Sequence, residues 1–236
     1  MPNPTITTCH SAPSCLVEGG KYRQDTLYFS ASDTWAQNTI LARKLVSDTI
    51  TTAITGTGVY TLAAAADAGR TLQVGAYALT AGTLSSGVGT WTAVAPDGQH
   101  EQFTSTAADD DLEFPNLGFT ITVTAPGGGA TQFATADVIA MTTTAQSGTP
   151  LVLFDVDGVN GAQVPVAILP YEVAKTSSGS VAADALYAGV VKKEKLVIDA
   201  DGDSTNVTDH VMDQLASAGF TVVFNTDVSV LDNGAS

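Results

Sequence analysis

The chain contains few charged residues, few basic ones and little cysteine. Only 14% of its 236 residues are charged, and nine Lys and Arg stand against 24 Asp and Glu, which gives a net charge of −15. This excess of negative charge repels phosphate backbones and anionic membrane surfaces, so we expect no nucleic acid and no membrane as partners. No hydrophobic run approaches the roughly 18 residues of a membrane-spanning helix.

Cysteine is too scarce to determine the fold. The two cysteines, Cys9 and Cys15, cannot build a disulfide scaffold. A zinc site that includes His10 is an alternative, but the spacing matches no common zinc-binding pattern, and we favour two free thiols. The first fifteen residues have neither a basic nor an apolar segment typical of signal peptides, and we expect none.

Ala, Thr, Gly, Val and Ser dominate the composition, which is typical of short strands and turns. Residues 51–147 repeatedly alternate apolar and polar residues, as in "TWTAV" at 90–94 and "FTITVTA" at 119–125. Turn sequences such as "PDG" at 96–98 separate these segments. The pattern predicts a small β-sandwich of immunoglobulin-like type over residues 51–147.

The two flanking segments, 26–50 and 148–236, predict a second β-rich domain that the sandwich interrupts. Such an insertion at a loop costs little, because loop-closure entropy grows slowly with length. One helix is predicted at 206–218, with Thr205 or Asn206 as its cap. The predicted fold class is therefore mainly β, with one C-terminal helix and an inserted sandwich.

Residues 1–25 differ from the rest of the chain. Proline and glycine interrupt this segment, and no hydrophobic periodicity persists through it. Such a segment buries too little apolar surface to order by itself. We expect either a frayed terminus or a flexible arm that becomes ordered on a partner.

The segment "LVLFDVDGVNG" at 151–161 raises the question of enzyme activity. Its D-x-D-G pattern resembles the loop of aspartate-based phosphatases, in which Asp155 would be the nucleophile and Asp157 the general acid beside Mg²⁺. That chemistry requires a parallel α/β sheet, and the sequence predicts no such sheet. We favour a strand that ends in a hairpin turn, with positive φ at the Asp-Gly and Asn-Gly pairs. We expect no enzyme and no cofactor.

Calcium is a further candidate, because acidic residues alternate at 155–161 and again at 199–206. An EF-hand loop needs Gly at its sixth position and Glu at its twelfth, and both segments lack them. Plain acidic turns are the favoured interpretation, with a weak surface cation site as the alternative.

The outer segments together resemble the head decoration proteins of tailed phages, the family of the lambda decoration protein D. The resemblance rests on the order of five features outside the insert. These are the arm at 1–25, "NTILARKLV" at 38–46, "TPLVLFDVDGVNGAQVPVAILPYEV" at 149–173, "ALYAGVVKKEKLVI" at 185–198 and "LASAGFTVVF" at 215–224. The insert is similar to the extra sandwich that some members carry.

The resemblance implies a structural role in a virus particle. Family members bind the outside of the expanded icosahedral head as trimers at local threefold axes and stabilise the shell. Their N-terminal arm adds to a strand of the major capsid protein, a β-augmentation. For this chain it implies synthesis in the host bacterial cytoplasm, a place on the outer surface of the capsid, and the major capsid protein and its own copies as partners.

Individual contact residues follow from this interpretation. We expect the arm residues Ile6, Leu16 and Val17 to become buried on the capsid. Trp35 and Tyr171 are candidates for core or trimer contacts, with the core favoured.

The alternative function is a glycan-binding or host-facing phage structural β protein. An exposed cluster of the aromatic residues in the insert would favour it. These residues are Tyr60, Tyr77, Trp91, Phe103, Phe114, Phe119 and Phe133.

Overall fold

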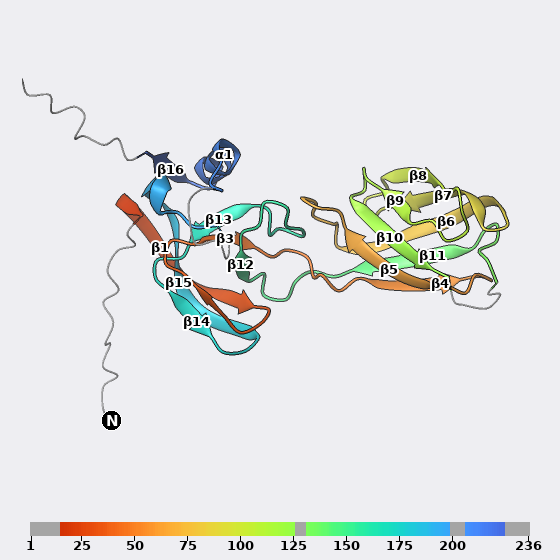
Figure 1. The fold of residues 1–236 in the computed structure, drawn as a ribbon, viewed down its shortest axis with the longest axis horizontal. Coiled ribbons are helices and arrows are strands. Elements are labelled where there is room, and N and C mark those ends of the chain that lie inside the picture. The colour runs from red at the N-terminus through yellow and green to blue at the C-terminus, as the bar shows by residue number, and fades with distance from the viewer. Residues whose placement is uncertain (1–14, 126–130, 199–205, 225–236) are drawn as a thin grey trace, which may run out of the picture. The chain divides into compact units, whose positions relative to one another are not determined.

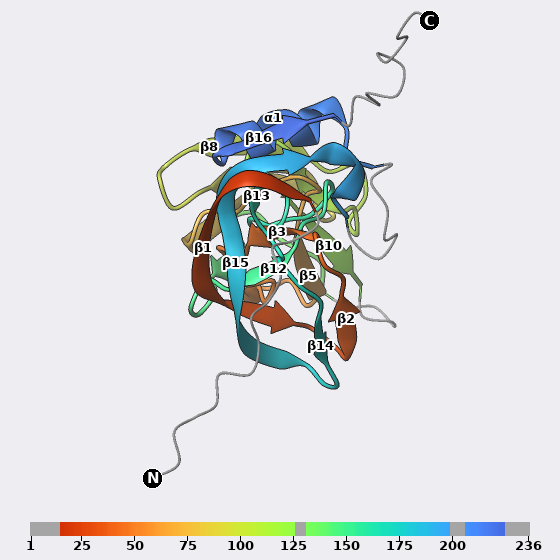
Figure 2. The ribbon, with the colours of Figure 1, turned by 90° about the vertical axis from the view of Figure 1, so that its left-hand side faces the viewer.

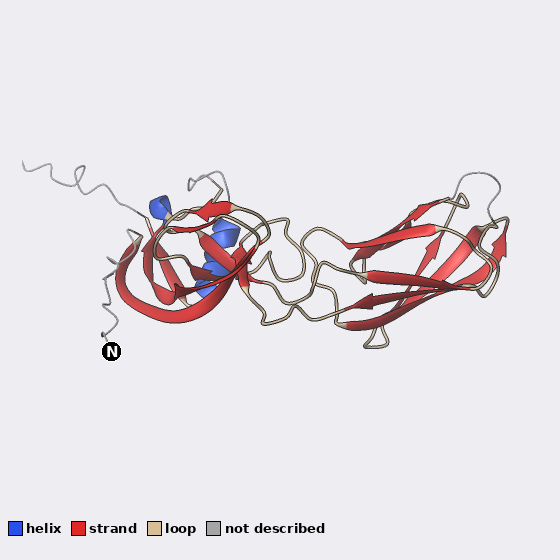
Figure 3. Cartoon of the chain, turned by 90° about the horizontal axis from the view of Figure 1, so that it is seen from below, coloured by secondary structure: helices blue, strands red, loops and turns tan. Residues whose placement is uncertain are grey.

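The fold is known from a computed structural model, which describes residues 15–125, 131–198 and 206–224. Among these residues the chain is mainly β, as predicted, with sixteen strands, one short 3₁₀ helix and one α-helix (Figures 1 and 3). None of the helices in these ranges has both the length and the apolar character needed to cross a membrane.

The chain divides into two compact units, each with its own core. We call them the barrel unit and the sandwich unit. The barrel unit comprises Met1–Arg43, Pro150–Asp155 and Val164–Ser236, and the sandwich unit comprises Lys44–Thr149 and Val156–Gln163. The predicted insert, 51–147, lies within the sandwich unit. The loop 156–163 also belongs to the sandwich unit, although the sequence pattern assigned it to the outer segments.

Five strands of the barrel unit form a closed barrel, in the order β1-β12-β3-β13-β15, with β15 pairing back to β1 (Figure 2). A sixth strand, β16, adds to β15 in parallel. The bounds are β1 Leu16–Phe29, β3 Ile40–Arg43, β12 Leu151–Leu153, β13 Pro165–Ile168, β15 Gly179–Lys192 and β16 Phe220–Val223. A separate two-stranded sheet joins β2, Asp33–Trp35, to β14, Val173–Lys175.

The predicted hairpin after Leu153 is wrong. The strands β12 and β13 do not pair with each other; both pair antiparallel with β3, one on each side. Of the two predicted turn pairs, only Asn160 and Gly161 adopt positive φ, at 59° and 105°. Two strands that lie on opposite sides of a third need no tight turn between them. The loop 156–163, which connects β12 to β13, can therefore pack in the sandwich unit.

Both faces of the barrel wall are covered. Alternate residues of β3 belong to two different clusters of buried residues. Leu41 belongs to the one that we name the inner cluster, and Ile40 and Ala42 belong to the one that we name the outer cluster. All five barrel strands contribute to the inner cluster: Leu27, Phe29, Trp35, Leu41, Leu151, Ala167, Leu169, Ala183 and Ala185. The outer cluster lies under the helix and β16.

The helix α1, Asp209–Ser217, is shorter than the predicted 206–218. Its cap is Thr208, whose hydroxyl accepts a hydrogen bond from the Val211 amide at 3.4 Å. It ends before Gly219, whose φ of 105° suits glycine. Val211 and Leu215 are fully buried in the outer cluster, so α1 covers the wall of the barrel. A 3₁₀ helix, η1 Lys193–Lys195, follows β15.

The predicted arm is too long, because residues 16–25 belong to β1. This strand pairs with β15 along its whole length, from Leu16 opposite Val191 to Phe29 opposite Gly179. Its first ten residues, "LVEGGKYRQD", are mostly polar or glycine, and their register is irregular around Gly19 and Gly20. Backbone pairing therefore orders a segment whose side chains give no hydrophobic signal.

The sandwich unit consists of two antiparallel sheets. One has the order β4-β11-β6-β7-β8 and the other β5-β10-β9. The bounds of the first sheet are β4 Thr51–Thr55, β6 Gly75–Ser85, β7 Val88–Val94, β8 His100–Thr104 and β11 Val138–Thr143. Those of the second are β5 Thr61–Ala66, β9 Leu112–Phe114 and β10 Phe119–Thr124.

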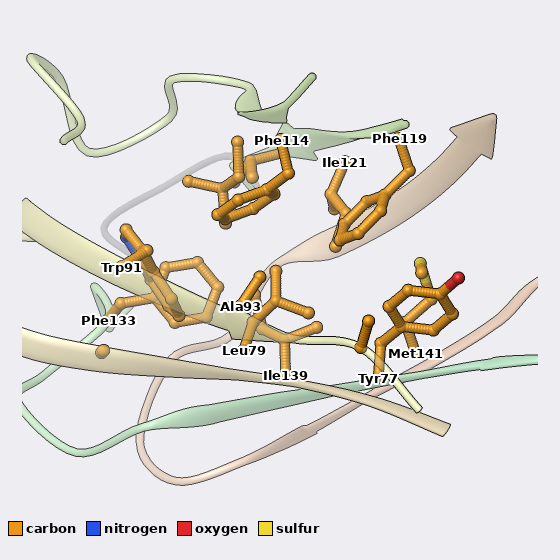
Figure 4. Packing of buried hydrophobic residues seen from close by; sticks show 14 of the residues in the cluster. Tyr77, Leu79, Trp91, Ala93, Phe114, Phe119, Ile121, Phe133, Ile139 and Met141 are labelled. Carbon is orange, nitrogen blue, oxygen red and sulfur yellow. The ribbon is translucent and has the colours of Figure 1, made fainter. Parts of the chain in front are cut away.

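Aromatic residues dominate the core between these sheets (Figure 4). The rings of Trp91 and Phe133 meet edge to face with centroids 5.0 Å apart, and those of Tyr77 and Phe119 do so at 5.3 Å. A buried aromatic side chain contributes roughly 2–3 kcal/mol through removal of its surface from water. The sandwich unit thus has its own source of stability.

Separate cores predict separate effects of core mutations. Trp91→Ala should lower the free energy of unfolding of the sandwich unit by about 3–5 kcal/mol, since it removes a large, fully buried side chain. In hydrogen-exchange mass spectrometry, amides of β6, β7 and β11 should exchange faster while those of β1 and β15 keep their protection. Trp35→Ala in the barrel unit is the matched control and should produce the opposite pattern. Faster exchange in both units for either variant would contradict the separation.

Candidate functional site

The predicted arm residues have different environments. Ile6 lies outside the described residues. Leu16 is partly buried against the outer cluster of the barrel unit, at the start of β1. Val17 is 50% exposed on β1. Leu16 packs into a gap left by two glycines: a Cβ at Gly189 would lie 2.8 Å from Leu16 Cδ1, and one at Gly20 2.7 Å from Cδ2.

Trp35 and Tyr171 both lie in the inner cluster of the barrel unit. Trp35 is 5% exposed and stacks on Phe29 at 4.0 Å, and its Nε1 donates to the Asp33 carboxylate at 3.0 Å. Tyr171 is partly buried, and its hydroxyl accepts a hydrogen bond from the Asp184 amide at 2.9 Å. Both aromatic side chains therefore serve the core of this unit.

The D-x-D-G segment does not have the surroundings of a phosphatase loop. The strand before it, β12, lies between β1 and β3 in the barrel wall rather than in a doubly wound α/β sheet. Asp155 and Asp157 are exposed, and they belong to different units. Within the described ranges, no three His, Cys, Asp or Glu side chains group as a metal site would require. The second acidic segment, 199–206, lies almost entirely outside those ranges.

Cys15 is a buried core residue rather than an exposed metal ligand. Its side chain is fully buried in the outer cluster of the barrel unit. Burial raises the pKa of the thiol to about 12 and outweighs the opposing effect of a backbone hydrogen bond. At neutral pH this buried thiol is therefore uncharged, which suits its apolar surroundings. The other two members of the proposed zinc set, Cys9 and His10, lie outside the described residues.

A charged cluster that the sequence did not predict links three strands of the barrel. Asp25 on β1 accepts hydrogen bonds at one carboxylate oxygen from Arg43 at 2.6 Å, from Arg23 at 2.7 Å and from the Tyr187 hydroxyl at 2.5 Å. Its other oxygen accepts from the Thr26 amide at 2.8 Å. The guanidinium of Arg23 also lies over the Tyr187 ring, 4.3 Å from its centroid. The cluster thus joins β1, β3 and β15.

The electrostatics of this cluster favour a charged Asp25. Burial by itself raises the pKa of this carboxyl, but the hydrogen bonds from Arg43, Tyr187 and Arg23 outweigh that effect and hold the pKa well below its ordinary value. Burial and the hydrogen bond to Asp25 raise the pKa of Tyr187. Asp25 is therefore an anion and Tyr187 a neutral donor throughout the physiological pH range. Such a cluster positions strands; it has no group ready to exchange protons near pH 7.

An open groove of about 480 Å³ lies between β4 and β5 of the sandwich unit. These strands are the outer strands of the two sheets on one side of the sandwich. The residues that line the groove are uncharged: Thr52, Ala53, Ile54, Gly58, Val59, Tyr60, Thr61 and Leu62. Tyr60 lies here half-buried, stacked on Phe133 at 4.4 Å. Each of the seven aromatic residues of the predicted insert is buried or partly buried, so they form no exposed cluster.

Comparison with known proteins gives no identification. No protein-family model matches the chain, and no curated protein matches it. Among solved structures, FlgL of Xanthomonas campestris matches with 16% sequence identity and a TM-score of 0.31. This match covers 45% of the chain and only 33% of FlgL, and a score so low supports no conclusion about fold or function.

The Asp25 cluster predicts a specific dependence of stability on pH. A carboxyl whose pKa is lower in the folded protein stabilises the fold above its unfolded pKa of about 4, and this contribution is lost as the pH falls toward the folded pKa. Asp25→Asn should lower the free energy of unfolding at pH 7 by roughly 3 kcal/mol, because Arg43 then lacks its buried counter-charge. The difference from wild type should shrink below about pH 4.

Urea denaturation between pH 2 and pH 7 measures this difference. Asp213→Asn, on the exposed face of α1, is the matched control and should follow the wild-type curve. A deficit in Asp25→Asn that stays constant down to pH 2 would contradict the assigned role of the carboxylate.

Proposed function

We propose that this chain is a decoration protein of a tailed-phage head. It binds the outside of the expanded icosahedral shell as trimers at local threefold axes, contacts the major capsid protein, and stabilises the shell. The observation that carries the proposal is the folding together of the segments that resemble the family. Most of these segments are far apart in the sequence yet belong to one compact unit: 38–43, 150–155, 164–173, 185–198 and 215–224. The remaining residues of the same segments, 44–46, 149 and 156–163, belong to the sandwich unit.

The position of the N-terminal segment also supports the proposal. Residues 1–14 join the barrel unit at Cys15, whose carbonyl accepts a hydrogen bond from the Lys192 amide at 2.8 Å. The chain is therefore fixed to the barrel from Cys15 onward, and the part that would bind the capsid protein is shorter than the sequence suggested. Of the proposed arm residues, Ile6 is the one that precedes this anchor.

The charge of the sandwich unit fits a domain displayed in many copies. It has two basic residues, Lys44 and Arg70, against ten acidic ones. A net negative surface keeps closely spaced copies from associating with one another. The glycan-binding alternative has less support, because the exposed aromatic cluster that would favour it does not occur among the described residues.

Co-sedimentation with expanded, undecorated heads of the phage tests the proposal. Full-length protein should pellet with the heads to saturation and raise the temperature at which the heads disrupt. A variant that lacks residues 1–14 but keeps Cys15 should fold, because β1 stays complete, and should fail to pellet. Deletion of 1–25 is unsuitable, since it removes most of β1 and opens the barrel. If the full-length protein does not pellet, the decoration role is wrong.

A further inference from the structure

The loop 156–163 of the sandwich unit contains a buried asparagine in an unusual backbone conformation. Asn160 is 1% exposed, and its φ of 59° lies in the left-handed region that residues other than glycine rarely adopt. Its backbone carbonyl accepts a hydrogen bond from the Leu45 amide at 2.8 Å, and its own N–H donates to the Arg70 carbonyl at 2.8 Å. The loop is therefore fixed beside the segment that starts the sandwich unit at Lys44.

The amine of Lys44 and the side-chain amide of Asn160 meet at one carboxylate oxygen. Lys44 Nζ donates to Asp48 Oδ1 at 2.6 Å, and Asn160 Nδ2 donates to the same oxygen at 3.3 Å. Lys44 Nζ also donates to the carbonyl of Val159, the neighbour of Asn160, at 3.4 Å. The Lys44 side chain is only 12% exposed, whereas that of Asp48 is 68% exposed. The amine is thus held beside the buried amide, and the carboxylate that touches both faces water.

The carbonyl of the same side-chain amide is polarised from its other end. The Leu72 backbone N–H donates to Asn160 Oδ1 at 3.2 Å. A donor in this position stabilises the negative charge that develops on the oxygen when a nucleophile adds to the carbonyl carbon. A nucleophile, a base in contact with it and an oxyanion donor therefore surround one amide. These are the groups that an acyl transfer requires.

We propose that Lys44 and Asn160 join spontaneously in an intramolecular isopeptide bond, with Asp48 as the catalytic base. Asp48 takes a proton from the Lys44 ammonium, and the lone pair of the resulting amine adds to Cγ of Asn160. The Cγ–Nδ2 bond then breaks, and Asp48 passes that proton and a second one from the lysine nitrogen to the departing nitrogen. The products are an amide between the two side chains and one ammonium ion, and Asp48 is again a carboxylate.

The fold supplies what this reaction needs without an enzyme or a co-reactant. Holding the amine and the amide together makes the step unimolecular, which removes much of the entropic barrier to amide exchange. The flexible four-carbon stem of Lys44 lets Nζ move from the Asp48 oxygen to the neighbouring carbon. The bond would close residues 44–160 into a covalent loop and stabilise the sandwich unit by restricting its unfolded state. It does not depend on the proposed decoration function.

Mass spectrometry of the intact, denatured full-length protein tests the bond. The measured mass should be lower than the mass calculated from the sequence by that of one ammonia molecule. Digestion with trypsin and chymotrypsin should release a branched peptide, and its fragmentation spectrum should place the link between Lys44 and Asn160.

Two variants test the nucleophile and the base, and they leave Asn160 and its hydrogen bonds to the backbone in place. Lys44→Arg keeps the positive charge but offers no amine, and Asp48→Asn removes the base, so each should show its full calculated mass. Lys21→Arg, at an exposed position of β1, is the matched control and should still lose one ammonia. Circular dichroism shows whether each variant is folded.

Two results would overturn the proposal. One is a full calculated mass for the folded wild-type protein, both when fresh and after days at 37 °C. The other is an ammonia loss that persists in Lys44→Arg, because Asn160 would then have cyclised onto the Gly161 nitrogen as a succinimide. Hydroxylamine cleaves a succinimide and leaves an isopeptide bond intact, so it separates these two products. No phage head takes part in these measurements, and their failure is distinguishable from failure of the decoration role.

Discussion

The pairing of β1 with β15 is the interaction on which the barrel unit depends. Both strands are fourteen residues long, and their ladder runs from Leu16 opposite Val191 to Phe29 opposite Gly179. The second half of the ladder closes the barrel, and the end of β15 at Gly189–Lys192 provides the edge on which β16 forms. Asp25 lies within the ladder and links it to β3 through Arg43. Loss of this pairing would open the barrel and expose both clusters of the unit.

The connection to the sandwich unit follows from the order of strands in the barrel. The chain leaves the barrel after β3 and returns at β12, and these two strands are direct neighbours, with Arg43 opposite Leu151. The points of exit and return are thus adjacent in the ladder. A long insertion between adjacent points imposes little strain on the host, and its entropic cost rises only slowly with length. The same pairing would form if a short turn replaced the insertion.

The parts of the fold that the sequence predicted are those with a local signal. "FTITVT" alternates because one face of β10 is buried, and the predicted strand at 119–125 matches it closely. The first ten residues of β1 gave no such signal, because what orders them is backbone pairing with residues of β15 that lie more than 150 positions away. The positive φ predicted at Asn160 and Gly161 occurs in the structure. A local turn sequence could not show, however, that β12 and β13 lie on opposite sides of β3 instead of pairing with each other. The Asp25 cluster joins three segments that only the topology brings together, so no spacing rule could have found it.

The ladder between β1 and β15 also has a mechanical consequence. Leu16 begins β1 at one end, whereas Leu27 lies beside Leu151, close to where the chain leaves for the sandwich unit. A force applied between residues 1–14 and the sandwich unit would therefore pull along the length of β1. The hydrogen bonds of the ladder run perpendicular to the strands, so such a force shears many of them at once instead of breaking them one by one. A protein tethered at its N-terminus would in this way resist tension with its longest strand pair.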